Sequence, residues 1–295
     1  MKLRTHRHVR YTIKIDDDDK DKELEIEHEP CDAPMVKKLD DGCTVVGYLS
    51  HDPDPSNPRE NDSLGTMVCW HKRYSLGGGG DEHRHAEIND LWRHLLGDDY
   101  ERIDQEACDE LNAWHQQHPQ YRFGSPESQR IRHAVSRKLQ QQIQTFLEER
   151  FVILPLYLYD HSGITMSTSS GRFHICDSHG WDWGMVGFIY VSKEDVLKTW
   201  SVKDWDDPVY YKHCNTTKTA RQRARDALVA EVDEYDHYLT GACYGVCVEV
   251  FGQDGQKFND HACWGFLGRK YATQSLQEEV ENTIKHLTKE NHPHE

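Results

Sequence analysis

The sequence predicts an α+β fold, with a mixed or antiparallel central sheet, a helical middle segment and flanking helices. Strand patterns occur singly and in hairpins, whereas helical patterns gather in the middle of the chain. The regular alternation of strands and helices that is typical of a parallel sheet does not occur. A chain of 295 residues is long enough for one large domain or two modest ones. We expect a single α+β domain over residues 1–295, or two tightly packed lobes at 1–76 and 86–290.

The amino-terminal part of the chain is expected to form four strands. Alternating apolar residues at 11–15 and 24–26 enclose the acidic run 16–22, which indicates a hairpin with a charged turn. The apolar runs CTVVGYL and LGTMVCW indicate two more strands at 43–49 and 64–70.

Composition predicts two loops and a frayed carboxyl-terminal tail. The linker 51–63 is rich in Pro, Asp and Asn, which is typical of an irregular surface loop. Residues 75–85 include four consecutive glycines, so we expect a flexible connection there. No Lys-Ser or Lys-Thr pair follows the glycines, so the run does not resemble a phosphate-binding loop. The tail 289–295 is expected to fray.

Three helices are predicted in the middle segment. The first two carry their apolar side chains between residues 88 and 114. Ser125 and Pro126 suit the start of the third helix, because proline is favoured at the first helical position. The apolar residues of the third helix recur at helical spacing, which predicts one buried face. They are Ile131, Val135, Leu139, Ile143, Phe146 and Leu147.

Two apolar runs after these helices are predicted to form the centre of the sheet. FVILPLYLY, residues 151–159, is apolar on both faces, as an interior strand should be. Pro155 lacks the N–H group that a ladder needs, so we expect a bulge or irregular pairing there. MVGFIYVS, residues 185–192, indicates a second interior strand.

Helices and one hairpin are expected in the remainder of the chain. Ser192 followed by Asp195 is typical of a capping box that begins a short helix. A longer amphipathic helix carries apolar residues from Ala220 to Leu239, and a last helix lies before the tail. Between these two helices, Asp254–Gly255 indicates the turn of a hairpin.

The chain is strongly acidic, with 51 acidic and 35 basic residues and a net charge of −16. Such an excess repels polyphosphate, so direct nucleic-acid binding is disfavoured. The acidity is compatible with binding a basic protein surface, with DNA mimicry, with a salty cytoplasm or with solubility alone. We find no apolar run of membrane-spanning length and no signal-peptide pattern. The nine cysteines include no CxxC pair, so we expect reduced thiols in a cytoplasmic protein.

Five blocks stand in order between residues 58 and 268, namely SLGTMVCWHKRYSLG, LPLYLYDHSGITMSTS, VGFIYVS, EYDHYLTG and CWGFLG. Together they resemble an uncharacterised protein family of bacteriophages, plasmids and other mobile elements. The resemblance implies a soluble accessory protein of a mobile element, and it implies no activity and no site residues. The stretch GRFHICDSHG departs from the family pattern, and the glycine run looks like an insertion.

Polar residues of metal-binding and catalytic types gather between the two interior strands. His174, Cys176 and His179 follow an H-x-C-x-x-H spacing, which offers three zinc-type ligands. The spacing matches no standard zinc signature. The alternative is a polar loop whose first residues cap the end of a strand. The full cluster is Asp160, His161, His174, Cys176, Asp177, His179 and Asp182.

The same cluster admits a catalytic interpretation. Asp160 and His161 come directly after a predicted interior strand, where they could act as a general acid–base pair with Asp182. With His174, they define a metal-assisted hydrolase as one candidate function. Ser162 lacks the flanking glycines and the following helix of a nucleophile elbow.

Two other patterns indicate binding surfaces. Lys218, Arg221 and Arg225 lie in the one basic stretch, and two of them share a helix face. A phosphate or an acidic partner could dock there, and the alternative is a solvated helix face. WDW (181–183) and CWG (263–265) place aromatic residues beside glycine, which is typical of interface hot spots and equally of core packing.

Two functions therefore remain open. The first is a soluble acidic accessory protein that binds a host or element protein, with DNA mimicry or an anti-defence action as its more specific form. The second is the metal-assisted hydrolase. The first requires a protein partner and no cofactor, and the second requires zinc.

Overall fold

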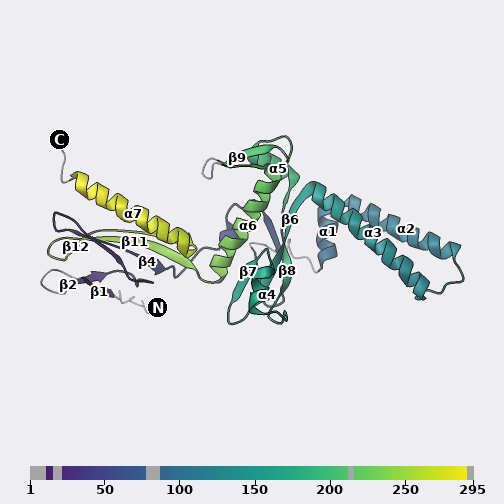
Figure 1. Ribbon diagram of the computed structural model, residues 1–295, viewed down its shortest axis with the longest axis horizontal. Coiled ribbons are helices and arrows are strands. Elements are labelled where there is room, and N and C mark those ends of the chain that lie inside the picture. The colour runs from purple at the N-terminus through teal and green to yellow at the C-terminus, as the bar shows by residue number, and fades with distance from the viewer. Residues whose placement is uncertain (1–10, 16–21, 78–86, 212–215, 291–295) are drawn as a thin grey trace, which may run out of the picture. The chain divides into compact units, whose positions relative to one another are not determined.

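The computed structural model describes residues 11–15, 22–77, 87–211 and 216–290 (Figure 1). It contains 7 helices and 12 strands, and the paired strands are antiparallel. The expected α+β fold is therefore confirmed. The predicted charged turn at 16–22 and the glycine-rich loop at 75–85 lie largely outside the described residues. The final helix continues to Glu290, and the rest of the predicted tail also lies outside them.

The chain divides into two compact units, which we call unit 1 and unit 2. Unit 1 comprises residues 1–58 and 234–295, and unit 2 comprises residues 59–233. Two elements contribute residues to both units, namely the short 3-10 helix η1 (Pro58–Glu60) and α6 (Ala220–Leu239). In the part of the chain that is described, no helix has both the length and the apolar character that a membrane crossing requires.

Unit 1 is a three-layered arrangement of a hairpin, a sheet and a helix (Figure 1). Its sheet has the strand order β12-β11-β4-β3. The hairpin β1-β2 covers one face of this sheet and α7 covers the other. The elements are β1 (Tyr11–Ile15), β2 (Lys22–Ile26), β3 (Met35–Lys38), β4 (Thr44–His51), β11 (Cys243–Phe251), β12 (Lys257–Leu267) and α7 (Arg269–Glu290).

Alternation along the strands of unit 1 explains why both faces are covered. Successive side chains of a strand point to opposite faces. Val45 and Leu49 of β4 therefore lie in the cluster against α7, while Val46 and Tyr48 lie in the cluster against the hairpin. Gly47 permits the close approach of α7, because a Cβ atom there would overlap the side chain of Val280.

Unit 2 is built on a second sheet, with the strand order β5-β8-β6-β7. β6 and β8 pair along their whole length, from Phe151 opposite Ser192 to Tyr159 opposite Trp183. The elements are β5 (Thr66–Cys69), α1 (Ile88–Leu96), α2 (Asp98–Gln117), α3 (Pro126–Arg150), β6 (Phe151–Asp160), β7 (Ile164–Ser167), α4 (Gly171–Cys176), β8 (Trp183–Ser192), α5 (Lys193–Trp200), β9 (Pro208–Tyr211) and β10 (Thr216–Thr219).

The two predicted interior strands are confirmed as neighbours in this sheet. Pro155 itself pairs in register with Phe188, contrary to the irregular pairing expected there, and the register between β6 and β8 shifts only between Leu156 and Tyr157. The predicted start of the third helix is confirmed, since α3 begins at Pro126, and the Ser125 hydroxyl accepts the N–H of Ser128. Helix α3 then leads directly into β6, which fixes the start of this central strand.

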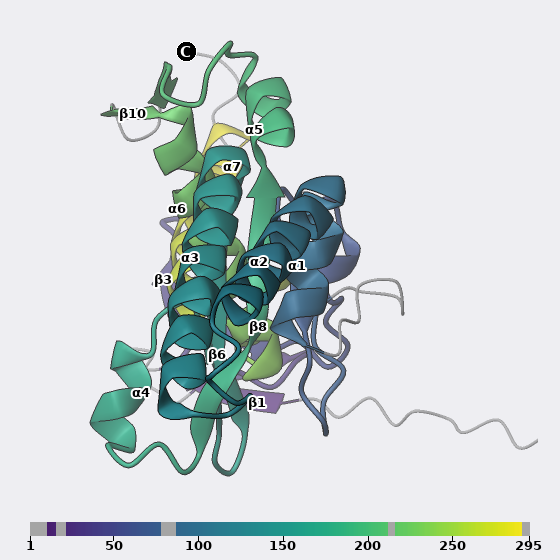
Figure 2. The ribbon, with the colours of Figure 1, turned by 90° about the vertical axis from the view of Figure 1, so that its right-hand side faces the viewer.

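Helices cover one face of the sheet in unit 2. Figure 2 shows α1, α2 and α3 in front of β6 and β8. Leu91 of α1 joins Val68 and Phe188 of the sheet in one buried cluster, and Ile103 of α2 joins Ile143 of α3 in another. Helix α3 therefore contributes to the core where it meets β6, and this junction borders a cavity that is described below.

Candidate functional site

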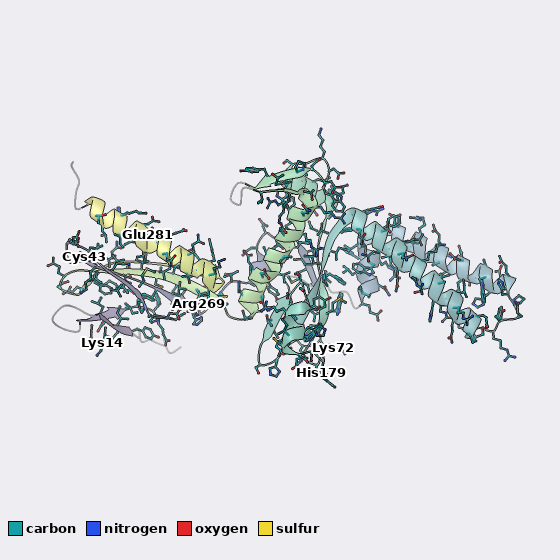
Figure 3. The ribbon with its side chains drawn as sticks, in the orientation of Figure 1. Lys14, Cys43, Lys72, His179, Arg269 and Glu281 are labelled. Atoms are coloured by element: carbon teal, nitrogen blue, oxygen red, sulfur yellow. The ribbon has the colours of Figure 1, made fainter. Side chains whose placement is uncertain are left out.

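Several predicted site residues meet at one end of the sheet of unit 2. β6 ends at Asp160, and β8 begins directly after Asp182. The backbone N–H of Asp160 donates to the carbonyl of Asp182 at 2.8 Å, so strand pairing holds the two residues together. In Figure 3, the labelled side chains of Lys72 and His179 lie at this same end of unit 2. We call Asp160, His161 and Asp182 the strand-end cluster.

The two carboxylates of the strand-end cluster have different partners. His161 Nδ1 lies 3.0 Å from Asp182 Oδ2, which gives an Asp–His pair. Asp160 instead accepts hydrogen bonds from Arg73 Nη2 at 2.5 Å and from the Tyr74 hydroxyl at 3.2 Å. Asp160 is thus a neutralised anchor for the loop after β5, whereas the Asp–His pair is oriented for proton transfer.

Exposure limits what the Asp–His pair can do. The side chain of His161 is 63% exposed and that of Asp182 is 40% exposed. Among the described residues, no hydroxyl or thiol group is hydrogen-bonded to His161, so the pair lacks an attached nucleophile. Catalysis by acid and base gains most where water is excluded and the reacting groups are fixed. The arrangement offers an oriented imidazole in an exposed position.

The predicted zinc ligands do not converge. His174 packs its ring against Trp183 at a centroid distance of 5.3 Å. The Cys176 thiol lies 3.9 Å from the Arg172 carbonyl of its own helix, α4. His179 lies near Ser178, with 3.4 Å between Nδ1 and Oγ. Across the described residues, no three His, Cys, Asp or Glu side chains form a group that could hold a metal ion.

Asp177 has a structural role in the same segment. Its carboxylate accepts the backbone N–H groups of Asp182 at 2.9 Å and His179 at 3.1 Å. These hydrogen bonds, that of Asp182 above all, hold the pKa of Asp177 below its ordinary value. The Asp177 carbonyl also accepts the indole N–H of Trp183 at 2.8 Å. Asp177 therefore fixes the loop that presents Asp182 to His161.

The predicted basic residues take three different roles. Lys218 Nζ lies 2.6 Å from Asp226 Oδ2, so its charge is paired. Arg221 donates to the Glu148 carbonyl at 3.0 Å and covers the Trp205 ring at 4.5 Å. Arg225 is exposed, and no ion pair or hydrogen bond joins it to another described residue. Arg221 and Arg225 line one cavity, and Lys218 does not.

A cavity of about 720 Å³ in unit 1 was not predicted from the sequence. We call it the acidic cavity. Tyr11, Glu27, His28, Glu29, His51 and Trp264 are among its lining residues, and no Lys or Arg of the described part of the chain lines it. The Tyr11 hydroxyl lies 3.4 Å from Glu29 Oε2, and the His28 ring meets the Trp264 ring edge-on at 4.9 Å.

Glycine and a buried carboxylate hold the walls of the acidic cavity in place. Trp264 lies over Gly245, where any Cβ atom would overlap the indole ring. Glu249 is buried, and its Oε1 accepts the N–H of Glu27 at 2.9 Å and the hydroxyl of Tyr48 at 2.6 Å. Burial and this hydrogen bond raise the pKa of Tyr48. Glu249 therefore fixes the backbone that carries Glu27 into the cavity.

Beside the acidic cavity, Lys257 forms ion pairs with three carboxylates. Lys257 Nζ lies 3.0 Å from Glu27, 2.9 Å from Asp260 and 3.4 Å from Glu249. Partial burial alone would lower the pKa of Lys257, but hydrogen bonds to Asp260 and Glu27 raise it overall. Three carboxylates and one ammonium group have a net negative charge, and the carboxylate of Glu29 makes the charge of this neighbourhood more negative. The neighbourhood therefore favours a cation.

Comparisons with known proteins give no guide to this site. No family model, no curated protein and no solved structure matches the chain. The resemblance to a family of mobile elements stays a prediction.

The acidic cavity could not be predicted from the sequence, because the residues that line it are far apart in the chain. Glu27 and Trp264 belong to opposite ends of the sequence and meet only through the sheet of unit 1. One signal was visible: Trp264 lies in the CWG stretch that indicated either an interface or core packing. A second was overlooked, namely the alternating acidic residues Glu23, Glu25, Glu27 and Glu29.

Proposed function

We propose that this chain is a non-catalytic accessory protein that binds a basic protein partner. In this proposal, the acidic cavity of unit 1 receives a lysine or arginine side chain of the partner. The observation that carries the proposal is the lining itself: among the described residues, the aromatic rings of Tyr11 and Trp264 occur together with Glu27 and Glu29, and no lysine or arginine lines the cavity. Aromatic faces and carboxylates both attract cations, and arginine is favoured most at such sites.

A row of acidic side chains extends from the cavity along the hairpin. Glu23 and Glu25 are exposed on β2 while Leu24, between them, is buried, and Glu27 and Glu29 continue the alternation. Alternate residues of a strand lie about 6.6 Å apart. Lys14 approaches Glu23 at 3.7 Å, but a pair so exposed contributes little. In this proposal, cations of the partner compete with Lys14 for Glu23 and with Lys257 for Glu27.

The row supports the more specific form of the proposal. Proteins that handle DNA present lysine and arginine side chains to a regular series of phosphates. A regular series of carboxylates beside a cation-binding cavity would compete for that surface. DNA mimicry with an anti-defence action thus becomes one version of the binding function, and it requires that DNA and the partner exclude each other.

Replacing Glu29 by Gln is expected to weaken binding of a basic peptide about fivefold, which corresponds to roughly 1 kcal/mol for one exposed charge. Fluorescence anisotropy of a fluorescein-labelled peptide with four arginines, at low salt, measures the dissociation constant. Trp264→Leu is expected to weaken binding at least as much, because it removes the aromatic wall.

Glu278→Gln provides the matched control. Glu278 is an exposed acid of the same unit, on α7, and its side chain contacts Gln274 at 3.0 Å rather than the cavity. The substitution changes the net charge by the same amount, so a general charge effect would lower affinity equally in both variants. Equal affinities for Glu29→Gln and Glu278→Gln would contradict the proposed site.

The strand-end cluster supports a second candidate function, a hydrolase that uses His161 as general base. The favouring observation is the 3.0 Å contact between His161 and Asp182. If this candidate is correct, Asp182→Asn lowers the hydrolysis of p-nitrophenyl acetate, with or without added zinc, about a hundredfold. Equal rates for the wild type, Asp182→Asn and His161→Gln would contradict it.

A further inference from the structure

A second cavity, of about 800 Å³, lies entirely among residues of unit 2. We call it the arginine cavity. Its walls come from α1, α3, β6, β8 and the first turns of α6. Pockets of roughly 300 to 1,000 Å³ are the usual size for small organic ligands. The cavity is therefore large enough for such a ligand.

One wall of the arginine cavity is apolar and partly aromatic. Trp92 of α1 and Phe188 of β8 lie with their ring centroids 5.0 Å apart, and Phe151 lines the cavity beside them. Ile143 and Leu147 of α3 complete this side. Apolar and aromatic side chains are the usual lining of sites for organic ligands. The wall thus suits an apolar or aromatic ligand body.

Arginine side chains of α6 form the opposite wall. Arg221 is held in place by the Glu148 carbonyl and the Trp205 ring. Arg225 lies one helical turn further on the same face of α6. Because Arg225 has no described partner, its five N–H donors are free to bind a ligand. A fixed guanidinium next to an unpaired one is a suitable site for an anionic group.

The polar groups around the two arginines leave the positive charge uncancelled. Glu148 also lines the cavity, but its Oε1 accepts the amide of Gln144 at 2.6 Å. Two guanidinium groups against one carboxylate give a net positive wall. Asn89, Gln140 and Gln222 add amide groups that can donate to, or accept from, polar atoms of the ligand body.

We infer that the arginine cavity binds a small organic anion, with its flat aromatic body against Trp92 and Phe188 and its anionic group on Arg225. The ligand class is an aromatic carboxylate, sulfonate or phosphate monoester. This site is separate in residues and opposite in charge from the acidic cavity of the proposed function. All of its lining residues belong to unit 2.

Two naphthalene probes test this inference. The first, 8-anilinonaphthalene-1-sulfonate, carries an aromatic body and one sulfonate, and the second, N-phenyl-1-naphthylamine, lacks the sulfonate. Fluorescence titration of the full-length protein is expected to show one saturable site that prefers the sulfonate. In Arg225→Gln the dissociation constant of the sulfonate probe rises about tenfold, as for the loss of one charge-assisted hydrogen bond, and that of the neutral probe is unchanged.

The matched control is Arg130→Gln, which removes an exposed arginine of α3 that does not line the cavity. Its affinity for the sulfonate probe is expected to equal that of the wild type. Unchanged binding of the neutral probe shows that the cavity of Arg225→Gln is still folded. The inference is overturned if Arg225→Gln and Arg130→Gln bind the sulfonate probe alike, or if the wild type shows no saturable binding.

Discussion

Replacing Gly187 by Ala is expected to destabilise unit 2 by about 3 kcal/mol. Gly187 lies in β8 between its two neighbouring strands, opposite Cys69 of β5 and Leu156 of β6. A Cβ atom at this position would overlap the carbonyl oxygen of Val68 and lie 2.9 Å from Cys69 Cα. Backbone atoms cannot turn aside as a flexible side chain can, so β5 must separate from β8. Amide hydrogen exchange is then expected to accelerate about a hundredfold in β6 and β8.

Gly184→Ala is the matched control in the same strand. No atom lies within 4 Å of a Cβ built on Gly184. The added methyl group therefore meets open space, and the loss of backbone freedom in the unfolded chain makes the change neutral or stabilising by about 0.5 kcal/mol. Exchange rates in Gly187→Ala that match those of Gly184→Ala would contradict the pairing of β5 with β8.

Replacing Glu249 by Ala is expected to destabilise unit 1 by about 3 kcal/mol. The carboxylate is buried, and its removal leaves the Tyr48 hydroxyl and the Glu27 N–H without their acceptor. Lys257 also loses one of its three carboxylates. Hydrogen exchange of the β4 and β11 amides measures the effect. Glu23→Ala is the control, because its pair with Lys14 is exposed and worth less than about 1 kcal/mol.

The same network predicts how the stability of unit 1 depends on pH. The pKa values of Tyr48 and Lys257 are both raised in the folded protein. Their contribution is therefore fully present below the ordinary values of about 10 and 10.4, and it is lost as the pH rises above them. Denaturation followed between pH 8 and pH 11 should show a shallower alkaline decline in Glu249→Ala. If the decline is equally steep in the wild type and in Glu249→Ala, the contacts of Glu249 with Tyr48 and Lys257 do not determine how the stability of unit 1 depends on pH.

The local elements of the fold were predictable because their signals are local. The Ser125–Pro126 start of α3 and the Ser192–Asp195 cap of α5 depend on residues within one turn. Asp254 and Gly255 likewise lie in the short loop between β11 and β12, where Gly255 has the positive φ that favours glycine. Helix α4 was not predicted, since its six residues are held by Phe173, which stacks on Tyr159 of β6 at 5.8 Å. A local pattern does not reveal such a contact.

In the candidate sites, too, features set by neighbouring residues were predictable, whereas contacts between distant residues were not. Arg221 and Arg225 were correctly assigned to one helix face, because a spacing of four residues determines it. His174 and Cys176 looked like paired ligands only by their spacing. On a helix, residues two apart point about 200° apart, and both fall within α4. The direction of a side chain, rather than the count of residues, decides whether ligands meet.

The central claim is that the acidic cavity of unit 1 receives a basic side chain of a protein partner. Its most direct test is an NMR titration of the full-length protein with the four-arginine peptide, following the Trp264 indole N–H, assigned by its loss in Trp264→Phe, and the Glu29 backbone amide. We expect both resonances to shift saturably with one dissociation constant, and Glu29→Gln to weaken that constant. A peptide that binds while the Trp264 and Glu29 resonances stay unmoved would contradict the claim.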